Sequence, residues 1–440
     1  MTSKSGLVAS GTSPLGFSRR HSLLCVNNSG YMKPHKDITI LRDLAKRYAE
    51  IAADPIQDEK RKLWRDHNSF IRTRIPILIL DWPCAHEIPE IINLECEDPF
   101  YRTHEYNLRI KLFHASCGDD WVQEPWITQR ATVVTPEGLW GLPIGRIPSN
   151  VPGGSWKFDP AIKNLDDANK MVLPKHVIDE EDTARNVARL QDAVGDILEV
   201  NVDRGPAWSI WGADISTYLS YLRGLDQLMW DMVDNPDWLH RVLAFMRDGI
   251  LKAQEEAEKA GDWQLCNSYN QAMPYSYELP DPKANSGPVT RDKLWVFMAA
   301  QEFTLISPEM HYEFMLQYQL PIIEKFGLSA YGCCEDLTNK IDMLRRIPNL
   351  RRIAVTPVAN VRRCAEQIGT DYILSYRPNP AEMVCCGFDP DHIRRTITNA
   401  LEDAKGCFLD ITLKDASTVE NQPWRLKEWV QIVREVTDRY

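Results

Sequence analysis

Short apolar runs alternate along the chain with longer segments in which apolar residues recur every three or four positions. The clearest run covers 75–80, is rich in isoleucine and leucine, and is followed by Asp81-Trp82-Pro83. A run of this length and composition predicts a buried strand and its exit loop. Similar runs predict seven further strands, at 108–115, 197–203, 263–270, 328–334, 352–356, 372–377 and 407–412.

Helical periodicity fills most of the intervals between these runs. One helix is predicted from Asp37 to Ile51, before the first strand, and another at 423–440. The clearest helix covers 235–260, because Asn235 can cap it, Pro236 suits its first turn and Gly261 can end it. Strands that alternate with helices indicate a parallel sheet with helical crossovers.

Eight such strands are the number that a closed (β/α)8 TIM barrel requires, here with an N-terminal helical extension. The rival architecture is an open doubly wound sheet. We disfavour it because Asp81-Trp82-Pro83-Cys84 follows the first strand, where a dinucleotide-binding fold has a glycine-rich turn. The region 117–184 is rich in proline, glycine and tryptophan, so we predict a β-rich insertion over the barrel mouth there.

The length of 440 residues suits one barrel domain with insertions, which we place at 36–440. Apolar residues make up 44% and charged residues 26%, as in ordinary globular proteins. The formal net charge of -11 disfavours a nucleic-acid partner and leaves a small-molecule substrate as the better expectation. No apolar run approaches the roughly 20 residues that span a bilayer, so we expect no membrane association.

The cysteines and the N-terminal residues indicate the cellular compartment of the protein. The 11 cysteines are dispersed and odd in number, which suits free thiols in a reducing compartment, and we expect a cytoplasmic protein. The first 31 residues hold Lys4, Arg19 and Arg20 but no acidic residue, so a transit peptide or a twin-arginine signal are alternatives. We expect residues 1–35 to be a disordered leader, because the stretch after the arginines is short and polar for an export signal.

The most pointed chemical signal is Cys333-Cys334-Glu335, at the expected junction of a strand and a helix. A thiol there feels the positive end of the helix, which favours a thiolate that acts as a nucleophile or a ligand. Two sulfurs beside a carboxylate also suit zinc. Because neighbours in an extended chain point to opposite faces, we expect one of the two cysteines to face the site. Simple packing of a buried cysteine is the alternative.

A second cluster ends another predicted strand. Pro378 restricts Arg377 to an extended conformation, which directs a permanently charged guanidinium away from the strand end. Such a group suits a carboxylate or phosphate on a substrate, and Tyr376 and Asn379 are candidate substrate-binding neighbours. A surface ion pair is the alternative role for Arg377.

Further candidates lie singly near strand ends. An acid at a strand exit can act as a general base or general acid, an aromatic wall can hold a ligand, and a histidine can bind substrate or metal. The alternatives are helix capping, ion pairing and core packing. The candidates are Asp81, Asp203 and Glu302 as catalytic acids, His86 and Trp208 as substrate-binding residues, and His311 as a metal ligand.

Over 36–440 the chain resembles the uroporphyrinogen decarboxylase-like superfamily. The resemblance implies a (β/α)8 barrel and one of two activities. One branch decarboxylates a tetrapyrrole without a cofactor, and another moves methyl groups between a substrate, a zinc-activated thiol and a corrinoid protein. The segments that carry the resemblance are Leu44-Ala45-Lys46-Arg47-Tyr48-Ala49, Ile306-Ser307-Pro308-Glu309-Met310, Gly332-Cys333-Cys334-Glu335 and Ser375-Tyr376-Arg377-Pro378-Asn379-Pro380.

The two branches differ in their motifs. The arginine-rich Arg-Gln-Ala-Gly-Arg-Tyr stretch of the decarboxylases is absent, which disfavours a polycarboxylate tetrapyrrole as substrate. The His-x-Cys zinc motif of the methyltransferases falls on Gly332-Cys333-Cys334, where only Cys334 matches, and no second cysteine lies near Arg377. The resemblance therefore implies a divergent methyltransferase whose zinc is held by Cys334 and Glu335, with Cys333 or His311.

We expect, on this basis, a methyltransferase that moves a methyl group from a small methylated or methoxylated substrate to a corrinoid on a partner protein or to a thiol. A cofactor-free decarboxylase is the first alternative, in which Asp81 or Asp203 steers a proton and Arg377 binds the carboxylate. A binding barrel without catalysis is the second.

Overall fold

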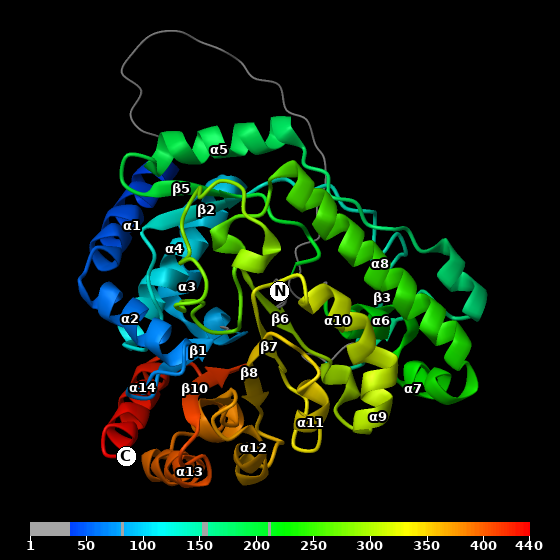
Figure 1. Cartoon of the computed structure of the whole chain (residues 1–440). Coiled ribbons are helices and arrows are strands. Elements are labelled where there is room, and N and C mark those ends of the chain that lie inside the picture. The colour runs from blue at the N-terminus through cyan, green and yellow to red at the C-terminus, as the bar shows by residue number, and fades with distance from the viewer. Residues whose placement is uncertain (1–35, 81–82, 152–156, 210–212) are drawn as a thin grey trace.

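A six-stranded parallel sheet forms the centre of an α/β fold (Figure 1). The computed structural model describes residues 36–80, 83–151, 157–209 and 213–440. The sheet curls into part of a barrel, and each strand is parallel to its neighbours. Its order is β1 (Ile77–Leu80), β10 (Phe408–Lys414), β9 (Ile373–Tyr376), β8 (Leu350–Val355), β7 (Leu328–Tyr331) and β6 (Trp295–Met298).

Two smaller sheets accompany this one. Strands β2 (Trp126–Arg130) and β5 (Glu199–Asp203) form a second parallel sheet, in register from Trp126 opposite Glu199 to Arg130 opposite Asp203. Strands β3 (Gly145–Ile147) and β4 (Lys157–Asp159) pair in antiparallel fashion. In the described part of 117–184, strands therefore occupy only three short stretches, and irregular chain makes up much of the expected β-rich insertion.

Side chains complete the free edges of the parallel sheets. The Ile77 amide donates to Asp120 Oδ2 at 2.8 Å, and the Ile79 amide donates to Asp119 Oδ2 at 2.9 Å. On the second sheet, the Val202 amide donates to Asn285 Oδ1 at 3.0 Å. Because an unpaired backbone group is costly when buried, these contacts stabilise strands that lack a neighbour on that side.

Helices precede, follow and cover the strands (Figure 1). Two of them, α1 and α2, come before β1, which confirms the N-terminal helical extension. Helix α8 begins after Asn235 and ends at Gly261, whose φ of 75° is left-handed, so both predicted ends are confirmed. The predicted cap is wrong, because the Asn235 side chain makes no capping hydrogen bond and donates to Asp231 Oδ1 at 2.9 Å. The helices are α1 (Lys36–Ala52), α2 (Ile56–Asn68), α3 (Pro89–Ile92), α4 (Pro99–Cys117), α5 (Glu180–Val194), α6 (Ser216–Arg223), α7 (Leu225–Asp234), α8 (Pro236–Ala260), α9 (Pro308–His311), α10 (Gln317–Ile323), α11 (Ile341–Leu344), α12 (Val361–Ile368), α13 (Pro390–Asp403) and α14 (Trp424–Thr437).

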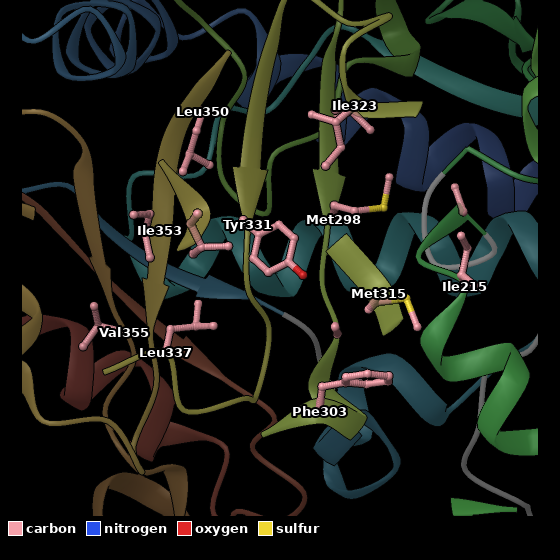
Figure 2. Packing of buried hydrophobic residues seen from close by; sticks show 14 of the residues in the cluster. Ile215, Met298, Phe303, Met315, Ile323, Tyr331, Leu337, Leu350, Ile353 and Val355 are labelled. Atoms are coloured by element: carbon pink, nitrogen blue, oxygen red, sulfur yellow. The ribbon is translucent and has the colours of Figure 1, made fainter. Parts of the chain in front are cut away.

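The two faces of the curled sheet differ in chemistry. Outward side chains such as Met298, Tyr331 and Ile353 belong to the main hydrophobic core against the helices, and Figure 2 shows them there. The inner face carries a polar network, because Asp410 accepts hydrogen bonds from Ser375 Oγ and Arg352 Nη2, both at 2.8 Å. Buried polar groups inside a curled sheet must be paired with one another, so the side chains of the inner face can adopt only one arrangement. The apolar face does not impose this restriction.

Six of the eight predicted strands are confirmed, and two predictions are wrong. The segment 108–115 lies inside helix α4, which begins after Asp98, whose side chain accepts a hydrogen bond from the Phe100 amide. The segment 263–270 holds only a short 3₁₀ helix (Leu265–Asn267) and runs beside β6, where Ser268 Oγ accepts from the Trp295 amide at 2.9 Å. Strand β6 itself was not predicted.

Several expectations lie outside the described residues. The expected leader at 1–35 is one, and Asp81 with the start of the first exit loop is another. Within the described ranges, none of the helices has the length and apolar character needed to cross a membrane.

A candidate thiol site at the carboxyl ends of the strands

A thiol, an ammonium group and a carboxylate meet where β7 and β10 end. Lys414 Nζ lies 3.3 Å from Cys333 Sγ and 3.9 Å from Cys334 Sγ. It also donates a hydrogen bond to Asp415 Oδ2 at 2.8 Å. The carboxyl ends of parallel strands are where α/β-barrel enzymes place their chemistry, so this cluster is the candidate site.

Two backbone features set this cluster in place. Gly332 has a φ of 102°, and a Cβ there would lie 2.7 Å from Leu337 Cδ1, so only glycine fits this strand exit. The turn at Gly332 places Cys333 in a small buried cluster with Phe297, Ala299 and Ala330. On β10, side chains at alternate positions share a face, which brings Lys414 to the same side as Asp410.

The thiol of Cys333 is activated by its neighbours. Its hydrogen-bonding contact with Cys334, whose Sγ is 3.5 Å away, lowers the pKa of Cys333 to about 7, with help from the charges of Lys414 and Arg377 and against burial. The same contact raises the pKa of Cys334. Burial opposes the charged form of Lys414, but the charges of Cys333 and Asp415 raise its pKa. Of the two thiols, Cys333 is therefore the one whose surroundings favour the thiolate.

Only one residue of the predicted cluster 376–379 reaches this site. Arg377 is 4% exposed, and its Nη1 donates to the Cys333 carbonyl oxygen at 3.2 Å. Tyr376 points to the opposite face, into the main hydrophobic core, where burial raises its pKa to about 12. Asn379 accepts a hydrogen bond from the Ala381 amide and so caps the following turn.

Glu335 connects the ends of two neighbouring strands through hydrogen bonds. Its side chain is fully buried, Oε1 accepts from the Ala300 amide at 2.9 Å, and Oε2 accepts from the Cys333 amide at 2.7 Å. These two bonds tie the exit of β6 to the exit of β7. Both oxygens accept hydrogen bonds from backbone donors, so Glu335 positions Cys333.

Two acids, the half-buried Glu302 and the buried Asp214, interact electrostatically with each other. Glu302, a predicted catalytic residue, accepts a hydrogen bond from Ser216 Oγ at 2.7 Å, and burial raises its pKa. Asp214 is fully buried, and desolvation, followed by the charge of Glu302, raises its pKa well above the usual range. The charge of Cys333 also acts on Asp214. Between Asp214 and Ser216, Ile215 adopts a φ of 68°, which is strained for a β-branched residue and typical of functional loops.

The structure places His311 away from the thiols. It is fully buried on the outer, helix-covered side, where its Nε2 lies 3.0 Å from the Tyr331 hydroxyl. That hydroxyl donates to Gln319 Oε1 at 2.9 Å. Burial lowers the pKa of His311 to about 3, so it is a neutral structural group.

Three other predicted site residues are also engaged elsewhere. Asp203 pairs with Arg130 and accepts from Asn267 Nδ2 at 2.7 Å. Trp208 is buried against Trp140, with ring centroids 6.3 Å apart. The half-exposed ring of His86 lies 2.9 Å from the Pro83 carbonyl oxygen through Nδ1. None of these contacts connects to Cys333.

The expected zinc ligands do not fit a zinc site in this arrangement. Glu335 and His311 are bound by other partners, and Gly332 occupies the position of the family histidine in a turn without room for a side chain. The ammonium group of Lys414 lies against the remaining donors. Among the described residues, no group of three or more histidine, cysteine, aspartate or glutamate side chains is arranged to hold a metal ion.

Sequence reasoning missed Asp214, Lys414 and Asp415. For Lys414, the signal was the alternation Asp410, Thr412, Lys414, which extends the last predicted strand by two residues. For Asp214, it was a capping pattern before a helix, since its side chain accepts from Thr217. Both are common structural patterns, and only their position beside a thiol gives them chemical meaning.

A cavity lies at the other end of the sheet. A cavity of about 240 Å³ opens near the amino ends of β1 and β10 and is lined by residues that include Arg72, Arg74 and Phe408. In an α/β barrel this end serves stability, whereas chemistry belongs to the other end. We therefore assign the site by its side chains and not by cavity size.

Fold and site together define an α/β protein with a thiol–lysine centre at the carboxyl ends of a curled parallel sheet. No protein-family model matches the chain, and no curated protein matches it. Because a fold of this kind hosts many activities, the function must be argued from the chemistry of the site.

Proposed function

We propose that the chain is a methyltransferase in which Cys333 accepts the methyl group of a small methylated or methoxylated substrate. The observation that carries the proposal is the 3.3 Å contact between Cys333 Sγ and Lys414 Nζ. A thiol with a pKa of about 7 is substantially ionised at neutral pH. A thiolate is the form of cysteine that attacks carbon, so the site holds an activated nucleophile.

We further propose that the two parallel sheets are parts of one (β/α)8 barrel. The order β6, β7, β8, β9, β10, β1 is that of consecutive barrel strands in which the last lies beside the first. Strands β2 and β5 come between β1 and β6 in the sequence and would fill the remaining arc. The segment that leads to β2 already bonds to β1 through Asp119 and Asp120, which supports this arrangement.

In the reaction, the Cys333 thiolate attacks the methyl carbon. A sulfur–carbon bond forms, the bond from the methyl carbon to the substrate oxygen breaks, and its electron pair stays on that oxygen. Glu302, whose pKa is raised, then donates its proton to the oxygen of a methoxylated substrate. A quaternary ammonium substrate needs no such proton, because its amine leaves as a neutral molecule.

The thiol is activated by Lys414 in this proposal, and no step is assigned to zinc. The methyl group then passes to a second acceptor, for which the family resemblance implies a corrinoid on a partner protein or an external thiol. We also propose that the enzyme is cytoplasmic and acts on a small molecule. Asp415 pairs with Lys414 once the thiolate charge is consumed, so the ammonium group stays compensated through the cycle.

The test is a mass measurement on the intact protein. After incubation with methoxylated aromatic compounds and with quaternary ammonium compounds, we expect a gain of one methyl group at Cys333, located by peptide mapping. Cys333→Ser should show no gain, whereas Cys386→Ser, which alters an exposed cysteine outside the site, should behave like the wild type. Methylation at another residue, or persistence in Cys333→Ser, would contradict the proposal.

A cofactor-free decarboxylase is the second candidate, and the convergence of Arg377 and Lys414 on Cys333 favours it. Two cations near one point can hold a carboxylate, and Glu302 could protonate the carbanion that remains when carbon dioxide leaves. This candidate predicts carbon dioxide release that survives chelators, Cys333→Ser and Cys334→Ser. Loss of turnover in Cys333→Ser would rule it out in favour of the methyltransferase.

A further inference from the structure

Arg377 is a buried cation that makes no ion pair with a carboxylate of the described residues. It is 4% exposed, and the hydrogen bond that it makes through Nη1 goes to a neutral carbonyl oxygen, that of Cys333. The other two cations inside the sheet are paired, since Arg352 contacts Asp410 and Lys414 contacts Asp415, both at 2.8 Å. A buried guanidinium is costly unless an anion compensates it, so an anion is expected at Arg377 when the site is in use.

A second polar group without a partner lies next to it. Within the described chain, Arg377 Nε and Thr412 Oγ1 are both buried and make no hydrogen bond. Ser375 pairs in register with Asp410, and Arg377 and Thr412 each lie two residues further along the same neighbouring strands. Side chains two apart in a strand share a face, so both unused groups belong to the inner face of the sheet.

We infer that Arg377 and Thr412 bind a carboxylate of the substrate, so that the methyl donor is a small methylated or methoxylated acid. The inference rests on the proposed function only in placing the substrate beside Cys333. Arg377 offers a guanidinium N–H and Thr412 a hydroxyl, which together suit the two oxygens of a carboxylate.

The charges of the site favour a single negative charge on the ligand. Lys414 pairs with the Asp415 carboxylate, and Arg377 makes no ion pair among the described residues, so one positive charge is left over whenever Cys333 is a neutral thiol or a methyl thioether. One surplus positive charge matches a carboxylate better than a phosphate, which carries nearly two negative charges at neutral pH. Because Arg377 bonds to the backbone of Cys333 itself, the acid group and the methyl group must lie close together in the substrate.

The inference is tested by calorimetric titration of the full chain with matched ligands. One pair is methoxyacetate and 2-methoxyethanol, and the other is glycine betaine and choline, so that each pair differs in the carboxylate. We expect the acid of at least one pair to bind roughly 10- to 100-fold more tightly than its alcohol partner, the range for hydrogen bonds to charged groups. Inorganic phosphate, as a third probe, should bind more weakly than that acid.

Variants then assign the preference to the two residues. Arg377→Met should abolish it, Arg377→Lys should reduce it and Thr412→Val should weaken acid binding several-fold. Arg395→Met, at an arginine whose side chain is 64% exposed, should leave it unchanged. If circular dichroism shows that Arg377→Met does not fold, the preference for the acid is assigned from Arg377→Lys and Thr412→Val. The inference would be overturned by equal binding of the acid and its alcohol partner, or by no binding of either acid. Tighter binding of phosphate, or an unchanged preference in these variants, would also overturn it.

Failure of this inference can be told from failure of the proposed chemistry. Cys333→Ser should still bind the acids more tightly than the alcohols, because it removes the nucleophile and keeps Arg377 and Thr412. Acid preference without any methylation of the wild type would contradict the methyltransferase alone. Methylation of Cys333 by the alcohols as fast as by the acids would contradict the carboxylate site alone.

Discussion

Lys414 Nζ lies 3.3 Å from Cys333 Sγ and 2.8 Å from Asp415 Oδ2, so one ammonium group joins a thiol to a carboxylate. The contact with Cys334 is the largest cause of the lowered pKa of Cys333, about 7, and the charge of Lys414 adds to it, although burial alone would raise the pKa. The arrangement also ties the exit of β7 to the exit of β10, which are not neighbours in the sheet.

Replacing Lys414 with methionine should raise the pKa of Cys333 above about 7, because the favourable charge on the thiolate is lost. The thiolate absorbs in the ultraviolet, so the titration can be followed as the difference between each protein and its Cys333→Ser counterpart. Cys334→Ala should act in the same direction, since contact with Cys334 is the largest cause of the lowered value. A titration step near pH 7 that survives Cys333→Ser would assign it to another group.

Glu302→Gln should slow methyl transfer from methoxylated substrates by roughly 10²- to 10⁴-fold, the usual contribution of a general acid. Transfer from quaternary ammonium substrates should be almost unchanged, because their leaving amine needs no proton. The measurement is the initial rate of Cys333 methylation with both substrate classes. Glu309→Gln, an exposed residue of helix α9, is the matched control. Equal loss with both classes would mean that Glu302 supports structure and not proton transfer.

Gly332→Ala should destabilise the fold by about 3 kcal/mol or more, because a left-handed backbone and a 2.7 Å approach to Leu337 act together. Gly387→Ala is the control, because Gly387 has a φ of 72° with nothing within 4 Å of the added Cβ. Its cost should be about 1 kcal/mol. Urea denaturation compares the two variants with the wild type. A similar loss of unfolding free energy in the two variants would show that Leu337 moves aside for the added methyl group at little cost.

His311 should make the fold acid-sensitive. Its pKa is about 3 in the folded chain against 6.5 for the free side chain, so the unfolded chain takes up a proton first as the pH falls. The free energy of unfolding therefore decreases between pH 6.5 and pH 3, and at pH 5 the loss is about 2 kcal/mol.

The check is the difference in unfolding free energy between pH 7 and pH 5. In His311→Gln this difference should shrink by about the same 2 kcal/mol, whatever the variant does to stability at pH 7. His86→Gln, at a half-exposed ring, should keep the wild-type difference. An unchanged pH dependence in His311→Gln would mean that the buried ring is protonated near its ordinary pKa.

The sequence predicted those strands whose apolar runs stand between clear turn signals, such as β1, β7 and β9. It failed where local pattern was ambiguous. The run at 108–115 is apolar enough for a strand, but the Asp98 cap and Pro99 start a helix that continues through it. Strand β6 has four residues and merges with Ala299 and Ala300, so no boundary marks it in the sequence.

For the site, sequence reasoning identified the residues that local geometry fixes and missed those that only the sheet brings together. Gly332 and Pro378 are turn-forming residues, and they allowed the sequence to predict that strands end near Cys333 and Arg377. Lys414 lies 81 positions from Cys333, and their contact depends on the curl of the sheet and on the turn at Gly332. Trp208, Asp203 and His311 were plausible by residue type, but their burial and partners depend on tertiary packing.

The carboxylates of Asp119 and Asp120 along β1 also bear on how the molecule avoids self-association. An exposed strand edge is a template on which another chain can add a strand and start aggregation. Here Asp120 bonds to the backbone at the edge of β1, and its carboxylate forms salt bridges with Arg74 and with Arg434 of the C-terminal helix α14. The last helix of the chain thus shields its first strand from other copies of the protein.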